Sequence, residues 1–274
     1  MSVRLGIIGG GVMGEALLSR LLAQKLYSPD AVLVGEPAAE RRQALSDQYG
    51  VQTTGSNKEV MASSETILLA VKPQIFKLVA NDFTTAQGDV GRDRPPLVIS
   101  ILAGVTLAQL ESAMPDWPVI RTMPNTPATV GAGMTAIALG SQATDEHGLI
   151  ATEMFGAVGE VVQVSEGMLD AVTGLSGSGP GYIAIVIEAL ADGGVAAGLP
   201  RAIASQLAAQ TVLGTAKLVQ ETGMHPAALK DRVTSPGGTT IAGIARLEES
   251  GLRSALIEAV RTASERSRQL GQSS

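Results

Sequence analysis

Residues 3–14 decide the fold, and they read VRLGIIGGGVMG. The apolar run at the start is typical of a buried strand, three glycines spaced G-x-G-x-x-G follow it, and a helical pattern over residues 13–24 begins at once. In such a turn Gly9 allows the tight bend, Gly11 lets a pyrophosphate approach the backbone, and Gly14 lets the helix pack on the strand. The helix N-terminus offers free N–H groups to phosphates, so the stretch predicts a dinucleotide-binding turn, a purely structural turn being the alternative. The predicted cofactor contacts are Gly9, Gly11, Val12, Met13 and Gly14.

An acidic residue follows the second candidate strand, residues 31–35. Glu36 stands 22 positions after Gly14, where a carboxylate ordinarily accepts hydrogen bonds from the adenosine ribose 2′-hydroxyl and so counts as a cofactor contact. The same carboxylate would repel the extra 2′-phosphate of NADPH, so Glu36 favours NADH. Arg41 and Arg42 follow closely and could offset that repulsion, or they could be solvated helix residues. The choice between NADH and NADPH stays open.

The first 165 residues alternate short apolar runs with helical patterns, which predicts a parallel sheet wound with helices. Two runs, TILLAV and LVISI, are apolar throughout, as strands buried on both faces are. The candidate strands are residues 3–9, 31–35, 66–71, 97–101, 119–122, 134–139 and 161–164, and helices are expected at residues 13–24 and 38–49. We therefore predict an α/β dinucleotide-binding domain over residues 1–165.

From residue 166 onward the strand-like runs stop and long helical patterns take over. Residues 183–197, 201–221 and 252–270 place apolar side chains three and four positions apart, which predicts an all-helical second domain over residues 166–274. Small side chains recur on the second of these helices and permit close contact between helices. They are Ala204, Ala208, Ala209, Thr211 and Thr215. They suit an intramolecular bundle and an interface between subunits equally well.

The composition excludes several kinds of protein. The 274 residues include no Cys, which excludes disulfides and thiolate chemistry, and His147 and His225 are too few for a multi-histidine metal site. The net charge is -6 and Lys and Arg build no basic stripe, which argues against a nucleic-acid partner. The N-terminal residues do not resemble a signal peptide, and the longest apolar helix candidate carries Glu188 and Asp192, which argues against a membrane span. We expect a cytoplasmic enzyme without a metal.

Two further loops stand beyond the carboxyl ends of predicted strands, where doubly wound sheets bind ligands. One follows the strand at residues 66–71 and reads AVKP; the other reads MPNTP and covers residues 123–127. Lys72 could reach a phosphate or a ribose and Asn125 a carboxamide, the alternative being that both are solvated loop tips. The predicted cofactor contacts of the two loops are Ala70, Val71, Lys72, Pro73 and Asn125.

Residues 234–244 read TSPGGTTIAGI and look like the start of a helix. Ser235 is a good N-cap, and Pro236 suits the first helical position. The N–H groups of the two glycines and two threonines that follow would then form an anion site, and the two hydroxyls would add directional contacts. These four residues are Gly237, Gly238, Thr239 and Thr240. A small carboxylate fits such a site, and an ordinary capped helix is the alternative.

Together these motifs resemble the pyrroline-5-carboxylate reductase family. GGGVMG, AVKP, MPNTP, LSGSGP and TSPGGTTIAG occur in the family's order and span essentially the whole chain; TSPGGTT is highly specific, whereas the glycine turn is shared with many reductases. The resemblance implies a Rossmann-type N-terminal domain and an all-α C-terminal dimerisation domain, with homodimers that in some members assemble into rings (decamers). It also implies reduction of the imino acid L-1-pyrroline-5-carboxylate to L-proline, the last step of proline biosynthesis, by NADPH or NADH.

The resemblance implies roles for individual residues as well. Asn57 would be a further cofactor contact, and the segment at residues 235–240 would hold the substrate, with the Thr240 hydroxyl nearest the ring nitrogen. The implied catalytic side chains are Thr240 and Ser235, and the implied substrate contacts are Glu166, Gly237, Gly238 and Thr239. Thr240 is a poor acid and the segment holds no His or Cys, so we expect catalysis by positioning of an already protonated imine.

Two other functions are compatible with part of the sequence. A hydroxy-acid dehydrogenase of similar two-domain architecture would share the first domain, but it would carry a catalytic Lys on the helix after its second glycine segment, and residues 181–199 contain no Lys. A non-catalytic dinucleotide-binding protein would keep the glycine turn and has no use for TSPGGTT.

Overall fold

The computed structural model describes residues 3–86 and 95–272. The chain forms two compact units. The first, Met1–Gly177 together with Ala263–Ser274, is the sheet unit, and the second, Ser178–Thr262, is the helical unit. The expected domain boundary between residues 165 and 166 precedes the boundary between these units and stays a prediction.

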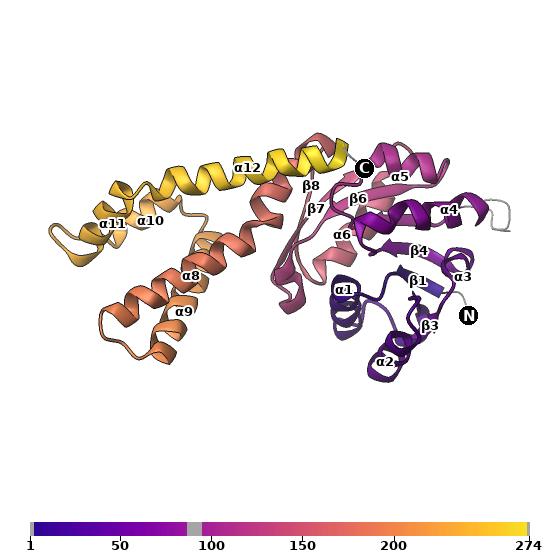
Figure 1. Ribbon diagram of the computed structural model, residues 1–274, viewed down its shortest axis with the longest axis horizontal. Coiled ribbons are helices and arrows are strands. Elements are labelled where there is room, and N and C mark those ends of the chain that lie inside the picture. Colours follow the sequence, from indigo (N-terminus) through magenta and orange to yellow (C-terminus); the bar gives the residue numbers. More distant parts are fainter. Residues whose placement is uncertain (1–2, 87–94, 273–274) are drawn as a thin grey trace. The chain divides into compact units, whose positions relative to one another are not determined.

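The sheet unit is built on an eight-stranded sheet within the described residues, in the order β3-β2-β1-β4-β5-β6-β7-β8 (Figure 1). The strands are β1 Val3–Ile8, β2 Val32–Gly35, β3 Gln52–Thr54, β4 Ser64–Leu69, β5 Leu97–Ser100, β6 Val119–Met123, β7 Gly133–Leu139 and β8 Gly159–Gln163. Neighbours run parallel except β6 and β7. The chain adds β2 and β3 on one side of β1 and then returns to β4 on the other. The strand order therefore reverses between β1 and β4, the place where such sheets bind ligands.

All seven predicted strands are present, with ends displaced by no more than two residues. The sequence missed β3, whose residues Gln52–Thr54 read QTT and pair with β2 at the edge of the sheet. An edge strand needs no apolar run, because it is only partly covered, so the periodicity that revealed the other strands is missing here.

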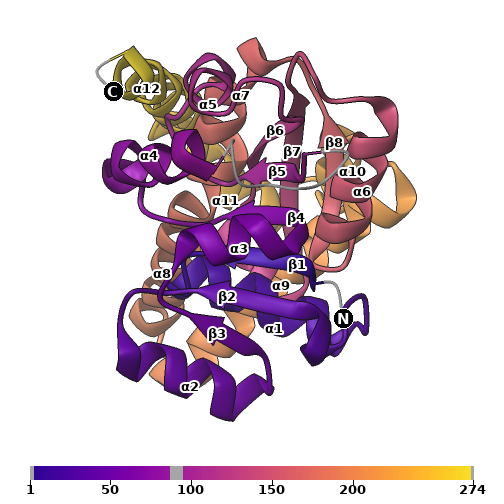
Figure 2. The same ribbon diagram turned by 90° about the vertical axis from the view of Figure 1, so that its right-hand side faces the viewer.

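Helices cover both faces of the sheet (Figure 2). On one face lie α1 Val12–Ala23, α2 Ala39–Tyr49 and α6 Asp145–Gly156, whose buried side chains include Leu17, Leu45 and Phe155. On the other lie α3 Asn57–Ser63, α4 Phe76–Ala86 and α5 Leu107–Ala113, whose buried side chains include Val60, Phe83 and Leu110. The strands are covered by apolar side chains on both faces, so the loops at the carboxyl edge of the sheet are joined to buried structure.

Short turns complete the sheet unit. The 3₁₀ turns are η1 Pro29–Ala31, η2 Pro73–Ile75, η3 Thr126–Val130 and η4 Glu166–Met168; α7 Leu169–Val172 and the π turn η5 Thr173–Gly177 end it. The C-terminal part of the last helix belongs to this unit as well. The Ser267 hydroxyl donates to the Asp170 carboxylate at 2.7 Å.

The helical unit contains α8 Gly179–Ala196, α9 Arg201–Thr222, α10 Pro226–Arg232, α11 Thr239–Glu249 and the first part of α12 Leu252–Gln272. The helices α8 and α9 pack through small residues, since Ala191, Ala204 and Ala208 are buried together. A Cβ added at Gly194 would lie 3.1 Å from the Ala204 Cβ, so the two backbones approach closely. Ala209 and the two threonines named above are exposed, so the intramolecular contact uses only part of the small-residue set.

The helical unit leaves large apolar side chains exposed. Ile185, Leu213 and Ile257 are 66%, 61% and 58% exposed, whereas the unit's buried cluster consists of alanines. Surfaces of this kind ordinarily mark a site of association. In the described part of the chain no helix combines the length and the hydropathy that crossing a membrane requires.

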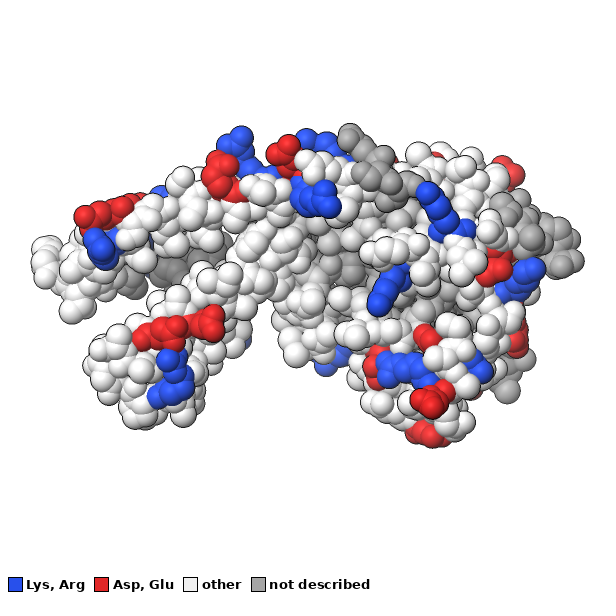
Figure 3. Space-filling model, viewed as in Figure 1, with Lys and Arg blue, Asp and Glu red and all other residues white. Residues whose placement is uncertain are grey.

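Charged side chains of both signs share the face of the structure seen in Figure 3. Acidic and basic groups often stand side by side there. In the helical unit, for example, Arg201 pairs with Asp192 at 2.6 Å and Arg253 with Glu248 at 2.6 Å. Such exposed pairs contribute about 0–1 kcal/mol each to stability.

Candidate active site

The glycine turn has the geometry that its spacing predicts. Gly9 has φ +108, and a Cβ added there would lie 2.7 Å from the Ala70 carbonyl oxygen. A Cβ at Gly14 would lie 2.2 Å from the Gly9 carbonyl oxygen, so this glycine lets α1 start against the turn. A Cβ at Gly11 meets nothing within 4 Å. The protein therefore fills the space beside Gly9 and Gly14, whereas the space beside Gly11 is open.

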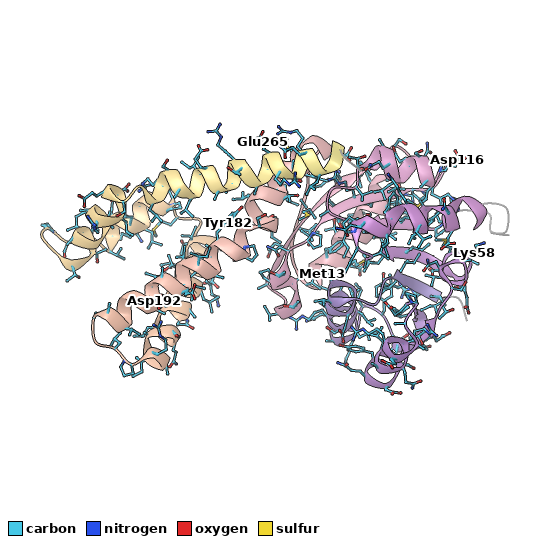
Figure 4. All side chains as sticks on the ribbon, viewed as in Figure 1. Met13, Lys58, Asp116, Tyr182, Asp192 and Glu265 are labelled. Atoms are coloured by element: carbon cyan, nitrogen blue, oxygen red, sulfur yellow. The ribbon has the colours of Figure 1, made fainter. Side chains whose placement is uncertain are left out.

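The start of α1 faces this open side. Gly11 is the N-cap and no side chain caps the helix, while Val12 is 84% exposed and Met13, labelled in Figure 4, is half-buried. The first N–H groups of a helix lack intrahelical partners, and here no side chain supplies one. Open space, free N–H groups and the positive end of the helix dipole together fit the pyrophosphate of a dinucleotide.

The AVKP loop lies beside the glycine turn, because β1 and β4 are neighbours. Ala70 donates its N–H to the Ile8 carbonyl at 2.8 Å, which extends the β1–β4 ladder into the loop. Lys72 precedes η2 and is exposed, and Pro73 starts that turn. The structure thus brings two separate sequence motifs side by side, and the exposed Lys72 stands in the second of them.

Glu36 reaches back from the end of β2 to the glycine turn. Its carboxylate accepts the N–H of Gly10 at 3.1 Å and the N–H of Ala38 at 3.1 Å. Arg41 binds the same residue, since its Nε donates to the Gly10 carbonyl at 2.9 Å. The Arg42 guanidinium donates to the carbonyl oxygens of Glu36 and of the next residue, each at 2.8 Å. Both arginines are thus bound to the protein, and neither is a merely solvated helix residue.

The Arg41 guanidinium also pairs with the Glu15 carboxylate on α1. Tyr49, the last residue of α2, donates its hydroxyl to the other oxygen of Glu15 at 3.1 Å. Burial, followed by the hydrogen bond to Glu15, raises the pKa of Tyr49. Glu15 and Tyr49 could not be found from the sequence, because a contact between two helices has no signal in the spacing of either one.

The two asparagines named as cofactor contacts have protein partners. The Asn57 amide donates to the Asp82 carboxylate at 2.9 Å. The Asn125 amide donates to the Ser176 carbonyl at 3.1 Å, and its oxygen accepts the Met134 N–H at 2.9 Å. Asn125 therefore joins the MPNTP loop to β7 and to the LSGSGP segment, and a contact with a carboxamide stays a prediction.

Glu166 lies in the sheet unit and is bound within it. Its Oε1 accepts the Leu107 N–H at 2.6 Å, at the start of α5, and the Arg121 guanidinium at 2.9 Å. The Arg121 side chain is only 9% exposed. An arginine inside the apolar strand VIRTM is a signal that an acidic partner lies nearby, because a buried arginine is ordinarily paired. The predicted contact of Glu166 with substrate stays untested beside this observed pairing.

The segment at residues 235–240 is a turn followed by a helix, so the expected N-cap at Ser235 is wrong. Gly238 donates its N–H to the Ser235 carbonyl at 3.0 Å, Gly237 has φ +66, and α11 begins at Thr239 with Gly238 as the N-cap. Pro at the second position and a left-handed Gly at the third favour a type II turn, which is why the helix starts later. The Gly238 N–H is used inside this turn, and the first N–H groups of α11 are those that remain for an anion.

Two family models and several known proteins are similar to this chain. The family model described as "Pyrroline-5-carboxylate reductase dimerisation" matches residues 166–270, and that described as "NADP oxidoreductase coenzyme F420-dependent" matches residues 4–104. A pyrroline-5-carboxylate reductase of Synechocystis is 58% identical over 99% of both chains. The structure of the Coxiella burnetii pyrroline-5-carboxylate reductase covers 98% of this chain and 99% of its own, with a TM-score of 0.90 and 33% identity. That of Plasmodium falciparum, with NADP bound, covers 98% of each chain with a TM-score of 0.87 and 28% identity.

A Rossmann-type sheet with an open glycine turn, joined to a helical dimerisation domain, defines an NAD(P)H-dependent oxidoreductase. Within this class the enzyme acts on a CH–NH group. The chain belongs to the pyrroline-5-carboxylate reductase family. The resemblance stated from the motifs is confirmed, as are the fold class, the activity of this family and the use of NAD(P)H. The two alternatives, a hydroxy-acid dehydrogenase and a non-catalytic dinucleotide-binding protein, are therefore not supported.

Proposed function

We propose that this chain reduces L-1-pyrroline-5-carboxylate to L-proline by holding NAD(P)H at the carboxyl edge of the sheet unit and the imino acid on the turn before α11. The observation that carries the assignment of the cofactor is the space at Gly11, where nothing lies within 4 Å of an added Cβ beside the uncapped start of α1. At Gly9 and Gly14, by contrast, an added Cβ would clash with the protein backbone.

The cofactor contacts proposed from the sequence divide into two groups. Gly9, Gly11, Val12, Met13 and Gly14 belong to the turn itself, and the proposed contacts elsewhere in the sheet unit are Glu36, Asn57, Ala70, Val71, Lys72, Pro73 and Asn125. Backbone N–H groups at the start of α1 would hold the pyrophosphate, and Lys72, which is exposed, would meet a phosphate or a ribose. Bound NAD(P)H supplies the hydride that reduces the C=N bond.

The imino acid is assigned to the helical unit. Its carboxylate would accept N–H groups at the start of α11, where Thr239 and Thr240 are exposed and Gly238, the N-cap, has no side chain to cap the helix. The Thr240 hydroxyl would hold the ring nitrogen, and Ser235 would support the turn as the acceptor of the Gly238 N–H. The assignment of Gly237 as a substrate contact is supported by its exposure rather than by a free N–H group.

Proton supply follows from the residue types present. The chain has no Cys, and its two imidazoles are on other elements, His147 on α6 and His225 at the N-cap of α10, where its Nδ1 accepts the Ala227 N–H at 3.2 Å. Thr240 orients the nitrogen and does not supply the proton. The enzyme would therefore select the imine that is already protonated and act by positioning it.

The exposed apolar side chains of the helical unit support a homodimer formed through this unit, in keeping with its match to a dimerisation family. We also propose that the dimers assemble into rings and that residues 166–274 form a separate domain. We further propose that the protein resides in the cytoplasm. The oligomer size is measured by light scattering of the purified chain. A monomer at micromolar concentration would contradict the assembly.

The reaction is tested with purified protein, L-1-pyrroline-5-carboxylate and NADH or NADPH. Loss of the near-ultraviolet absorbance of the reduced nicotinamide should match the proline formed. The matched control substrate is 1-pyrroline, the same ring without a carboxylate, which should react with a much lower kcat/KM if the start of α11 binds the anion. Absence of oxidation with both cofactors contradicts the reaction, and equal kcat/KM for the two imines contradicts the anion site alone.

A further inference from the structure

Two cations of α2 lie near the end of β2, and both are held by the protein. The Arg42 guanidinium is bound by two carbonyl oxygens of the loop that follows β2, each at 2.8 Å. Arg41 is bound by the Gly10 carbonyl and by the Glu15 carboxylate on α1. The end of β2 is where the adenosine ribose lies in dinucleotide-binding sheets, so these are the arginines that a 2′-phosphate would need.

The Glu15 carboxylate that binds Arg41 has a second partner. Glu15 contacts the guanidinium with one oxygen while its other oxygen accepts the Tyr49 hydroxyl at 3.1 Å, so the carboxylate is itself oriented. The side chains of Arg41 and Glu15 are 34% and 24% exposed, which removes part of the solvent screening that weakens surface pairs. The Glu15 carboxylate neutralises the Arg41 charge, so another anion would have to compete with it for this guanidinium.

The acid at the end of the strand adds to this arrangement. Glu36 keeps its carboxylate at the turn through the N–H groups of Gly10 and Ala38. Glu36 thus binds Gly10 directly, whereas Glu15 neutralises the Arg41 guanidinium that binds the same residue. Of the two arginines on α2, Arg41 is neutralised by the Glu15 carboxylate, whereas Arg42 is bound by uncharged carbonyl oxygens.

We propose that Glu15 is a specificity-determining residue for the cofactor: by holding Arg41 on the glycine turn, it withholds that guanidinium from the 2′-phosphate of NADPH and so favours NADH. The proposal rests on the proposed function of the turn as the dinucleotide site. The two acids would act differently: Glu36 would repel the 2′-phosphate directly, and Glu15 would neutralise the Arg41 guanidinium that could otherwise pair with that phosphate.

The test is direct binding of NADH and NADPH, followed by nucleotide fluorescence or calorimetry. Glu15→Gln keeps an oxygen for the Tyr49 hydroxyl but loses the charge that holds Arg41. The ratio of the NADPH Kd to the NADH Kd should fall by about fivefold, while the NADH Kd changes by less than about twofold. In the double variant Glu15→Gln/Arg41→Gln the ratio should return to the wild-type value.

Glu40→Gln is the matched control. Glu40 is exposed in the first turn of α2, the helix that carries Arg41, and the substitution removes the same charge as Glu15→Gln. An equal shift in Glu15→Gln and Glu40→Gln would overturn the proposal, since the effect would then be a general charge effect. A shift that survives removal of Arg41 would overturn it too. Failure of the wild-type protein to bind either dinucleotide would instead contradict the proposed function of the turn.

Discussion

Arg121 on β6 and Glu166 on η4 form a hydrogen-bonded ion pair, with 2.9 Å between Nη1 and Oε1, although 45 residues separate them in the sequence. The same carboxylate oxygen accepts the Leu107 N–H at the start of α5. Glu166→Gln leaves a nearly buried guanidinium without its counter-charge, so the free energy of unfolding should fall by about 2 kcal/mol. Urea denaturation measures this loss.

The control is Arg121→Met, which removes the buried charge itself. The double variant Arg121→Met/Glu166→Gln should lose less stability than the sum of the two single variants, because the two side chains act as a pair. A role of Glu166 confined to the substrate would show differently: the unfolding midpoint would stay at the wild-type value and only the KM for the imino acid would rise.

Gly14 and Gly11 offer a matched pair of variants in one turn. Gly14→Ala places a methyl group 2.2 Å from the Gly9 carbonyl oxygen, so α1 must move and the fold should lose about 2–3 kcal/mol. Gly11→Ala places its methyl in open space and should change stability by less than about 1 kcal/mol while weakening dinucleotide binding. Thermal unfolding and NADH titration separate the two effects. Unchanged NADH affinity in Gly11→Ala would show that the pyrophosphate does not approach this glycine.

Thr240 is expected to act through its hydroxyl on the ring nitrogen. Thr240→Ala should reduce kcat/KM for L-1-pyrroline-5-carboxylate by roughly 1–3 kcal/mol in transition-state free energy, the value of a lost hydrogen bond to a charged group. Thr240→Ser keeps the hydroxyl and should recover most of the rate, and Thr239→Ala, which keeps its backbone N–H, should cost less than Thr240→Ala. Steady-state kinetics with NADH held saturating gives the comparison. Wild-type kinetics in Thr240→Ala would remove this residue from the mechanism.

Tyr27 should make the sheet unit sensitive to alkali. Burial raises the pKa of Tyr27, with Glu153 and Glu65 adding to the rise and Arg4 opposing it. Above a pH of about 10 the unfolded chain ionises this phenol while the folded chain still keeps it neutral, so stability present at lower pH is lost as pH rises. The free energy of unfolding should therefore fall less steeply with rising pH in Tyr27→Phe than in the wild type. Equal slopes in urea denaturation across the alkaline range would contradict this.

Much of the sheet unit could be predicted because burial imposes a pattern on the strands themselves. Strand β4 is covered on both faces, and its apolar run alone located it. Edge strand β3 lacked that pattern and was missed. The start of α11 was placed too early, because Ser235 and Pro236 suit both a helix start and a type II turn. The left-handed Gly237 and the hydrogen bond inside the turn decide for the turn.

By itself the sequence determined what depends on neighbours along the chain: the glycine turn, the buried strands, the long helices and the family motifs. Only the tertiary structure decided which distant side chains meet. It brought Glu15 to Arg41 and Glu166 to Arg121, and it assigned Asn125 two backbone partners. The reason is physical. A pattern records how one segment is buried, whereas a pairing of charges depends on two segments that the folded sheet and its helices bring together.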